Sequence, residues 1–291
     1  IRASWGADEL SLYGRFDFIL AKDGTPKILE FNADTPTSLL EASVIQWQWK
    51  EDVFPECDQF NGIHEGLVQS WKDIFPKKGE IHFAGALENN EDTGTLQYLA
   101  STAMEAGFST RVLDMQALDL QNGRFFDPAG ELVNRCFKLY PWEWMVDESP
   151  DGCLAEMEWL EPIWKLVMSN KAILATLYEL FPDSPYVLPC YLSRPRSGLF
   201  CKKPVFSREG HNVSVVDIRD WEEYVRIAET EGDYNTGAYV YQEYVEPTAY
   251  SGRYPVIGSW IIGGEAAGIG IRENRMEVTD NLSEFVPHII G

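Results

Sequence analysis

The stretch GRFDFILAKDGTPKILEFNADTPTS, residues 14–38, contains two apolar runs with Asp23-Gly24 between them. Asp-Gly between two such runs is a strong signal for a tight turn, so the stretch predicts an antiparallel hairpin with a two-residue loop. Successive side chains of a strand point to opposite faces of the sheet. One face of the hairpin would therefore be an apolar core layer that consists of Phe16, Phe18, Leu29 and Phe31.

The other face of the hairpin would carry charge. A two-residue loop sets Asp17 opposite Glu30 and Arg15 opposite Asn32, and a loop two residues longer keeps all four on this face. Two carboxylates on facing strands repel each other. Mg²⁺, which prefers carboxylate, carbonyl and phosphate oxygens, would relieve that repulsion. Arg15 could instead neutralise the carboxylates in an ordinary salt bridge, so the hairpin alone leaves a metal site and a salt-bridged surface open.

The segment after the hairpin, NADTPTS, places Thr35, Thr37 and Ser38 immediately before a predicted helix at 39–50. Hydroxyl groups and free backbone N–H groups at a helix N-terminus form an anion site. Ser38 and Glu41 also match a capping box, which closes a helix start without any ligand. The segment is compatible with either interpretation.

The composition excludes several classes of protein. The chain of 291 residues has no apolar run long enough for a transmembrane helix, and its net charge of −22 argues against a nucleic-acid partner. The five cysteines are scattered and form no C-x-x-C pair, as expected for reduced thiols in a cytoplasmic protein. With four histidines and no H-E-x-x-H motif, a zinc site is not expected. The oligomeric state is not indicated by the sequence.

Strands and helices alternate along the rest of the chain. An apolar strand at 81–87, a helix from Asp92 to Gly107 and a strand at 109–115 predict a βαβ unit. This mixture predicts an α/β or α+β fold rather than a bundle or a sandwich. A helix at 170–181 precedes a β-rich region, in which we expect strands at 199–205, 212–217, 238–245, 254–262 and 266–272 and one helix near 219–231.

Four cations in the second half of the chain stand where an anion could bind. Lys171 lies in the first turn of its helix and opposes the helix dipole, although chance placement would give the same pattern. Lys203 ends an apolar strand, and Arg208 follows in the loop SREG, which could fold over an anion or form a plain exposed hairpin. No Walker motif is present. Arg272 ends the small-residue strand AAGIGIRE, where a ligand can approach closely and a guanidinium can bind phosphate or carboxylate in a bidentate manner.

Five segments resemble the glutathionylspermidine synthase family in the same order: RFDF…ILEFNADTPTSLLEA, NKAIL, KPVFSREGHNV, YQEYVEP and GSWIIGGEAAGIGIRE. The resemblance covers residues 12–288 and implies an α+β, ATP-grasp-like fold in permuted order, with a metal-binding hairpin before a β-rich nucleotide-binding lobe. It divides one synthetase unit, 1–291, into the hairpin with its following helices at 1–80, an α/β subdomain at 81–165, the nucleotide-binding lobe at 166–252 and return strands at 253–291.

The resemblance also implies roles for single residues. Asp17, Glu30 and Asn32 match the family's magnesium ligands. Thr35 and Thr37, with Ser38 beside them, match hydroxyl residues near the acyl substrate and the phosphate. Glu88 lies where the family places acidic residues near the amine. The matches around the nucleotide are Arg15 near the phosphate and acyl group, Lys171 and Lys203 at the ATP phosphates, Arg208 in the lid loop, Gln242, Glu243, Tyr244 and Val245 at the adenine, and Arg272 at the transferring phosphate.

The activity that the resemblance implies is an ATP- and Mg²⁺-dependent ligation of a small-molecule carboxylate to a small-molecule amine through an acyl-phosphate. In the named enzyme the carboxylate is the glycine end of glutathione and the amine is a polyamine. We expect no membrane partner and no amidase domain, and we expect that a segment before the hairpin is missing from this sequence. The acyl donor therefore stays open. The alternatives are a nucleotide-binding sensor or scaffold with the same fold, and a metal-dependent hydrolase.

Overall fold

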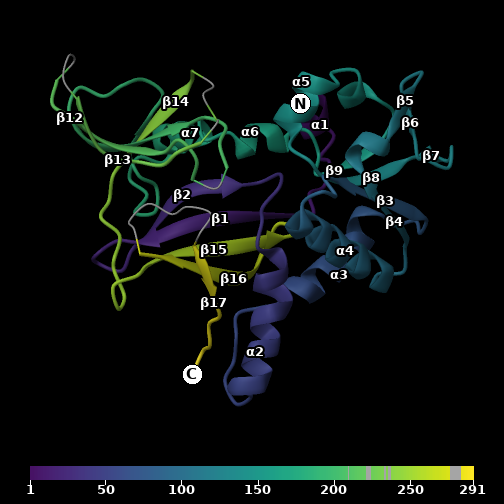
Figure 1. Ribbon diagram of the computed structural model, residues 1–291, viewed down its shortest axis with the longest axis horizontal. Helices are drawn as coiled ribbons and strands as arrows, with labels where there is room; N and C mark the ends of the chain where they lie inside the picture. Colours follow the sequence, from purple (N-terminus) through teal and green to yellow (C-terminus); the bar gives the residue numbers. More distant parts are fainter. Residues whose placement is uncertain (209, 221–223, 233, 235–236, 276–282) are drawn as a thin grey trace.

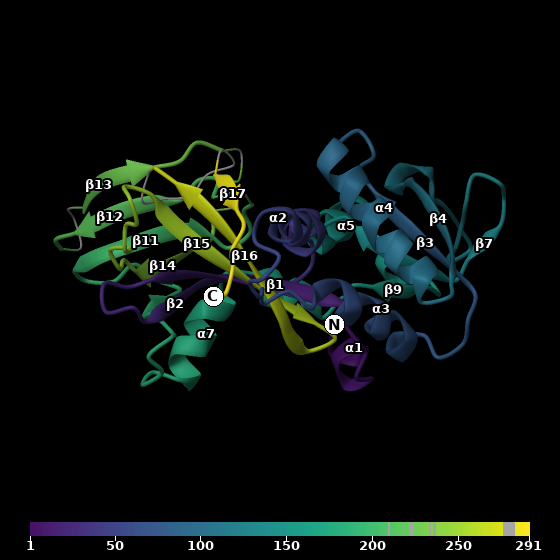
Figure 2. The ribbon, with the colours of Figure 1, turned by 90° about the horizontal axis from the view of Figure 1, so that it is seen from below.

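The computed structural model describes residues 1–291 except for 209, 221–223, 233, 235–236 and 276–282. The described residues combine β-sheets with helices in an α+β arrangement, as predicted. Two five-stranded antiparallel sheets occupy one end of the molecule, and a four-stranded parallel sheet with its helices occupies the other (Figures 1 and 2). Among the described residues, no helix is both long and apolar enough to cross a bilayer.

The first antiparallel sheet joins the two ends of the chain. Its strand order is β17-β16-β15-β1-β2, so β1 lies between its hairpin partner and a strand from the far end of the sequence. This pairing explains how residues near the start of the chain meet residues near its end. The strands are β1 (Tyr13–Leu20), β2 (Pro26–Asn32), β15 (Tyr254–Ile262), β16 (Glu265–Asn274) and β17 (Glu284–Val286).

The charged end of the β1–β2 hairpin has the predicted register. Asp17 pairs with Glu30, and Arg15 pairs with Asn32. All four side chains therefore share one face of the sheet, which is the arrangement that the sequence predicts. On the opposite face, the ring centroids of Phe16 and Phe31 lie 4.0 Å apart. The predicted core layer is only partly correct, because all four of its residues are half-buried and Leu29 lines the pocket described below.

The loop of the hairpin is longer than predicted. Residues 21–25 connect the strands, and a bulge sets Phe18 opposite Ile28 before the charged register begins. Gly24 has φ +82°, a left-handed conformation that glycine adopts without steric cost. The predicted two-residue turn is therefore wrong. The facing residues are nevertheless correct, because the extra residue of the bulge compensates for the longer loop.

The second antiparallel sheet has the order β10-β14-β11-β12-β13. The helix predicted near 219–231 is wrong, since Tyr224–Glu229 forms the outer strand β13, and 221–223 lie outside the described residues. Its sequence YVRIAE is rich in Tyr, Val and Ile, which favour strands, and pairing with β12 decides the outcome. The other strands are β10 (Cys190–Tyr191), β11 (Gly198–Pro204), β12 (Ser214–Ile218) and β14 (Tyr239–Glu243).

The parallel sheet contains the predicted βαβ unit. Strands β3 (Glu80–Gly85) and β4 (Ser109–Asp114) pair in parallel and are connected by α4 (Asn90–Glu105). Beside them lie β8 (Arg135–Leu139) and β9 (Glu158–Leu160), and a small sheet of β5 (Asp119–Gln121), β6 (Arg124–Phe126) and β7 (Leu132–Val133) adjoins. The core between this sheet, α4 and α3 (Ile63–Ile74) is aromatic and fully buried, with Trp71, Phe83 and Phe137 at its centre.

The helix after the hairpin starts differently from the prediction. Its first part, Glu41–Ile45, is a π-helix, and α2 (Gln46–Val53) continues it outward from the body of the molecule (Figure 1). The predicted capping box is wrong, because Ser38 has φ +65° rather than the extended backbone of an N-cap, and the start of the π-helix has no side-chain cap hydrogen bond. The remaining helices are α1 (Arg2–Gly6), α5 (Trp142–Glu148), α6 (Lys165–Ser169) and α7 (Ile173–Leu180), with 3₁₀ turns at Met115–Ala117 and Gly152–Leu154.

Candidate active site

A pocket lies between the two antiparallel sheets, against the charged face of the hairpin. It is lined by most of the residues that the sequence analysis singled out: Arg15, Asp17, Glu30, Asn32, Thr35, Thr37, Lys171, Lys203, Arg208, Gln242, Glu243, Tyr244, Val245 and Arg272. The structure thus brings these residues together from the whole length of the chain, while their roles in binding stay predictions. Ser38 and Glu88 are the two predicted residues outside this lining.

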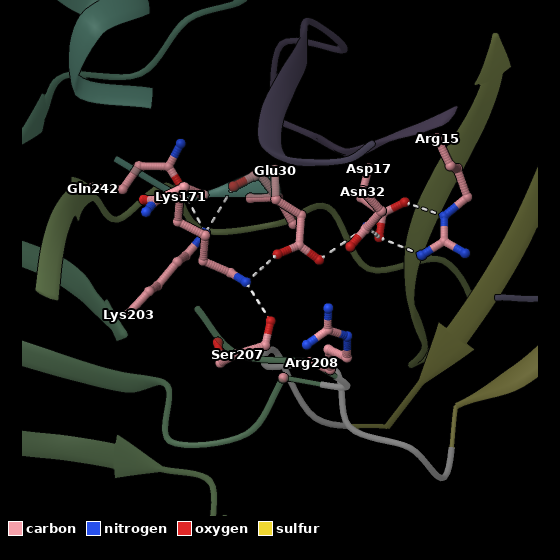
Figure 3. A network of polar contacts seen from close by, with 12 residues as sticks. Arg15, Asp17, Glu30, Asn32, Lys171, Lys203, Ser207, Arg208 and Gln242 are labelled. Atoms are coloured by element: carbon pink, nitrogen blue, oxygen red, sulfur yellow. Dashed lines mark hydrogen bonds and ion pairs between the residues drawn. The ribbon is translucent and has the colours of Figure 1, made fainter. Parts of the chain in front are cut away.

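Asp17 is the centre of an ion-pair network in this pocket (Figure 3). Arg15 binds it in a bidentate manner, with Nε at 2.6 Å from Oδ1 and Nη2 at 3.0 Å from Oδ2, and Arg272 Nη2 lies 2.7 Å from Oδ2. Burial opposes the charge of Arg15, but Asp17 outweighs burial and raises the pKa of this guanidinium. The pKa of Arg272 is lowered by burial and by the nearby Arg15. One buried carboxylate therefore holds two cations in place.

Glu30 is paired with Lys171, which precedes α7 and does not lie in the first turn of that helix as predicted. Lys171 Nζ lies 3.0 Å from Glu30 Oε2 and donates to the carbonyl of Ser207 at 2.7 Å (Figure 3). Burial alone would raise the pKa of Glu30, but Lys171 and Lys203 outweigh it and lower the pKa to about 2. Glu30 is therefore ionised and held between cations at neutral pH. The contacts in the structure are those of the alternative interpretation from the sequence, in which salt bridges neutralise the carboxylates of the hairpin face.

Lys203 is held on the strand side of the pocket. Its Nζ donates to Gln242 Oε1 at 2.7 Å and to the carbonyl of Leu29 at 3.0 Å, and Gln242 Nε2 donates to the carbonyl of Ile28 at 2.8 Å. Leu29 is the bulge residue, which has no partner on β1 in the hairpin register. Its carbonyl accepts the hydrogen bond from Lys203. Burial lowers the pKa of Lys203. The two sheets are thus connected by polar contacts at the bottom of the pocket.

Asn32 lies between the two carboxylates. Its Nδ2 is 3.2 Å from Asp17 Oδ2 and 3.2 Å from Glu30 Oε1. A half-turn of the side-chain amide would direct Oδ1 to the same place, giving two carboxylates and one amide oxygen. This oxygen donor set fits Mg²⁺, which needs few protein ligands when phosphate oxygens complete its shell. Within the described residues, no group of three or more His, Cys, Asp or Glu suited to another metal is present.

The loop between β2 and the π-helix faces the pocket with its hydroxyl residues. Thr35 and Thr37 line the pocket, and Arg15 Nη1 donates to the carbonyl of Thr37. Asp34 points the other way and is buried, with Oδ1 at 2.8 Å from Lys138 Nζ. This anchor could not be predicted from the sequence, because Lys138 lies far from Asp34 in the chain and belongs to none of the recognised segments.

Arg208 is held by a short segment of α5. Its Nη1 lies 2.5 Å from Glu143 Oε1, and its guanidinium lies over the ring of Trp144 at 5.4 Å from the centroid. Glu143 outweighs burial and raises the pKa of Arg208. Glu143 and Trp144 could not be predicted as partners of Arg208, because they lie far from it in the chain. Arg208 is thus positioned above the pocket by the parallel-sheet end of the molecule.

A second cavity adjoins the first and is acidic. It is lined by Asn89, Glu91 and Asp92 at the start of α4, by residues of α5 and of the loop before it, and by His211 and Tyr234. Asn89 caps the helix by accepting from the N–H of Glu91 at 2.9 Å. Thr35, Thr37 and Arg208 line both cavities. These three residues therefore form a wall shared by a cation-rich pocket and an acidic one.

Glu88, the acidic residue predicted near the amine, lies outside both cavities. It is an exposed turn residue between β3 and α4. Because α4 begins at Asn90, Glu91 and Asp92 occupy its first turn and reach the cavity instead. The sequence predicts that this helix begins at Asp92, but it begins two residues earlier in the structure. That earlier start was not recognised from the sequence. Acidic residues in a first turn also stabilise the helix dipole, which is a structural role of their own.

The predicted adenine segment is not an open strand edge. Strand β14 lies between β10 and β11 up to Glu243, whose N–H donates to the carbonyl of Pro189 at 2.7 Å. The Tyr244 N–H donates to the carbonyl of Leu199 at 2.9 Å. Neighbouring strands therefore already bind the N–H groups of Glu243 and Tyr244, and the match of this run to the adenine segment stays a prediction. All four residues of the segment, Gln242 to Val245, line the pocket.

Three named proteins resemble this chain over nearly its whole length. A protein of Haemophilus influenzae, whose name proposes an acid–amine ligase, is 39% identical over 303 residues, which cover 99% of this chain and 77% of that protein. Trypanothione synthetase of Crithidia fasciculata is 28% identical over 98% of this chain, and the bifunctional glutathionylspermidine synthetase/amidase of Escherichia coli is 26% identical over all of it. The chain spans 48% and 51% of the length of these last two relatives.

Two solved structures have a similar fold. A protein of Methylobacillus flagellatus, described as a candidate γ-glutamylcysteine synthetase, matches 99% of this chain and 82% of its own with a TM-score of 0.62 at 10% identity. A glutathione synthetase-like effector of Globodera pallida matches 97% of this chain and 77% of its own with a TM-score of 0.58 at 10% identity. At such low identity, these likenesses concern the fold alone.

A family comparison covers the whole chain. Residues 1–291 match the family described as glutathionylspermidine synthase preATP-grasp, which is the family that the five ordered segments resemble. Since the match covers the whole chain, and a relative with 39% identity spans nearly all of it, the chain belongs to the glutathionylspermidine synthase family.

Proposed function

We propose that this protein joins a small-molecule carboxylate to an amine at the expense of ATP, through an acyl-phosphate. The observation that carries the proposal is the wall shared by the two cavities. Thr35, Thr37 and Arg208 separate a pocket rich in cations and oxygen donors from an acidic one. A phosphoryl group needs the first environment, an amine suits the second, and an acyl group at the shared wall would be in reach of both.

The cation-rich pocket would bind the phosphates of ATP. Asp17, Glu30 and Asn32 would hold Mg²⁺, which neutralises phosphate charge when it is bound. Arg15, Arg272, Lys171 and Lys203 are buried or nearly so and are already oriented by protein contacts. Preorganised cations stabilise the charge on a transferring phosphoryl group without reorganisation at the moment of reaction. ATP and Mg²⁺ dependence is thus the expectation for this pocket.

In the first step a carboxylate oxygen attacks the γ-phosphorus, and the bond between that phosphorus and the ADP oxygen breaks. Arg272 and Lys171 would balance charge on the transferred group, and the hydroxyls of Thr35 and Thr37 would bind the acyl-phosphate. In the second step the amine nitrogen attacks the acyl carbon, and phosphate leaves with one of the carboxylate oxygens. Arg208 lies between the cavities and would help to exclude water, which otherwise hydrolyses the intermediate.

The acidic cavity would select the amine. Glu91 and Asp92 lie in the first turn of α4 and face the same cavity as Thr35 and Thr37. Carboxylates attract a cationic ligand, and a polyamine would leave one amine free to react while others pair with acids. The names of two relatives contain glutathionylspermidine and trypanothione, so glutathione and spermidine are the first acid and amine to test.

The experiment is an ADP-release assay with Mg-ATP, glutathione and spermidine, followed by mass spectrometry of the product. We expect ADP release that needs both the acid and the amine, and one amide product for each ADP. Acids without a thiol, and diamines, would extend the search if this pair is inactive. Ligation without ATP consumption contradicts the proposal.

A sensor or scaffold that binds nucleotide is the second candidate. The observation in its favour is that Asp17 and Glu30 are paired with protein cations, a self-neutralised arrangement that is stable without metal. Tight Mg-ATP binding measured by calorimetry, together with no ADP release for a broad panel of acids and amines, would support this candidate over the ligase.

A further inference from the structure

A buried ion pair of Lys138 and Asp34 lies behind the shared wall. Its importance for catalysis rests on the proposed function. Lys138 on β8 is 0% exposed and Asp34 is 1% exposed, and their charged atoms lie 2.8 Å apart. Lys138 Nζ also donates to the carbonyl of Tyr140 at 2.9 Å. The other carboxylate oxygen of Asp34 accepts from the N–H of Trp142 at 2.8 Å.

This pair ties the hydroxyl loop to the start of α5. Asp34 directly precedes Thr35, so the backbone position of Thr35 depends on where Asp34 is held. Trp142 is the first residue of α5, and the next two residues, Glu143 and Trp144, hold Arg208. One short segment of chain therefore anchors both the hydroxyl loop and the arginine above it.

The buried charges are a costly way to fill a core. Apolar residues of similar volume often stabilise a protein as well as a buried ion pair does, or better, whereas removal of one partner leaves an unpaired charge. The burial penalty is visible in the pKa of Lys138, which burial lowers although Asp34 acts to raise it. Unlike apolar residues, the pair makes directional contacts. Lys138 bonds to Asp34 and to the carbonyl of Tyr140, and Asp34 accepts from the N–H of Trp142.

We propose that Lys138 is a positioning residue, which acts through Asp34 to set Thr35 and Thr37 against Arg208 at the junction of the two cavities. Lys138 does not line either cavity, so it touches neither substrate. Its effect should therefore appear in the use of the acyl-phosphate rather than in the binding of ATP. A loop that is held loosely would let the intermediate meet water before it meets the amine.

The test uses the full chain and the double variant Lys138→Met with Asp34→Asn, which leaves no buried charge behind. Lys138→Met alone is expected to unfold more easily, because Asp34 keeps its charge without a partner. The control is Leu67→Ala in α3, a fully buried core residue that touches neither cavity lining and lowers stability by a different route.

The first readout needs no substrate. Deuterium uptake at residues 33–38 should rise about tenfold in rate in the double variant, because local opening then costs less, while the parallel-sheet core keeps its protection. The Leu67→Ala control should leave residues 33–38 unchanged. Wild-type uptake at 33–38 in the folded double variant, or an equal rise in the control, overturns the proposal whether or not the protein is a ligase.

The second readout uses glutathione and spermidine, or the pair identified for the wild type. The double variant should keep wild-type affinity for Mg-AMP-PNP, raise the KM for the acid and form less amide for each ADP released. An unchanged ratio of amide to ADP contradicts the positioning role. If the wild type turns over no acid and amine, the proposed function fails by itself, and the uptake measurement still decides whether Lys138 positions the loop.

Discussion

The two cavities that meet at Thr35, Thr37 and Arg208 hold their charges in opposite ways. In the pocket of Asp17 and Glu30, each carboxylate is paired with a cation from a distant part of the chain, and Asp17 also pairs with its near neighbour Arg15. In the acidic cavity, Glu91 and Asp92 belong to the first turn of a helix and lie near its surface. A buried and crosslinked network can stay oriented for phosphate, whereas acids at a helix start can exchange a cationic ligand with water.

The largest effect is expected from a substitution at the centre of the buried network. Asp17→Asn removes the charge that holds Arg15 and Arg272, and it weakens the proposed set of Mg²⁺ ligands. We expect the rate of ADP release to fall by at least the roughly 10²–10³ that follows from the loss of one transition-state donor. Steady-state kinetics with Mg-ATP, acid and amine measures it. A variant with full turnover would exclude Asp17 from the mechanism.

The next effect tests one cation of the same network. Arg272→Met should lower kcat by about 10²–10³, because a preorganised charge at the transferring phosphate is lost. The matched control is Arg253→Met, since Arg253 pairs with Glu284 at 2.6 Å outside the pocket lining. Equal losses of kcat in the two variants would mean that the loss of any positive charge lowers the rate, and that the position of Arg272 in the pocket is not the cause.

A smaller effect is expected on the acidic side. Glu91→Gln and Asp92→Asn should each raise the KM for the amine about fivefold, which corresponds to about 1 kcal/mol, with little change in the KM for ATP. Glu88→Gln is the control, because Glu88 lies outside the cavity lining. If Glu88→Gln raised the KM and the other two did not, the amine site would lie where the sequence first placed it.

The smallest effect is on stability in acid. The pKa of Glu30 is lowered from 4.5 to about 2, so its contribution to stability is fully present above about pH 4.5 and is lost as the pH falls toward 2. Urea unfolding at several pH values should show that Glu30→Gln loses less stability across this window than the wild type does. Glu246→Gln, an exposed partner of Lys22, should behave like the wild type. An identical acid dependence in wild type and Glu30→Gln would contradict the assignment.

The hairpin shows how far the sequence could lead. Alternation along two short strands was sufficient to place Asp17 and Glu30 on one face, whereas their register agrees with the prediction because the bulge offsets the longer loop. The loop was wrong because a bulge is set by packing rather than by the Asp-Gly signal. The helix near 219–231 was wrong for a similar reason, as pairing with β12 overrode the local pattern.

The candidate site was predictable where residues belong to ordered segments of the chain. Arg15, Lys171 and Arg272 could be singled out because each lies in a short recognisable stretch. Lys138, Glu143 and the capped start of α4 could not, because their partners are brought together only by the packing of the parallel sheet against the loop. Long-range contacts of this kind leave no trace in local composition.

The most direct test of the central claim follows the oxygen atoms of the acid. Glutathione labelled with ¹⁸O in its glycine carboxylate is incubated with the enzyme, Mg-ATP and spermidine, and the released phosphate is analysed by mass spectrometry. An acyl-phosphate at the shared wall predicts that each phosphate carries one ¹⁸O atom, because the carboxylate oxygen that attacks the phosphorus leaves with it. Amide formation with unlabelled phosphate would contradict the account.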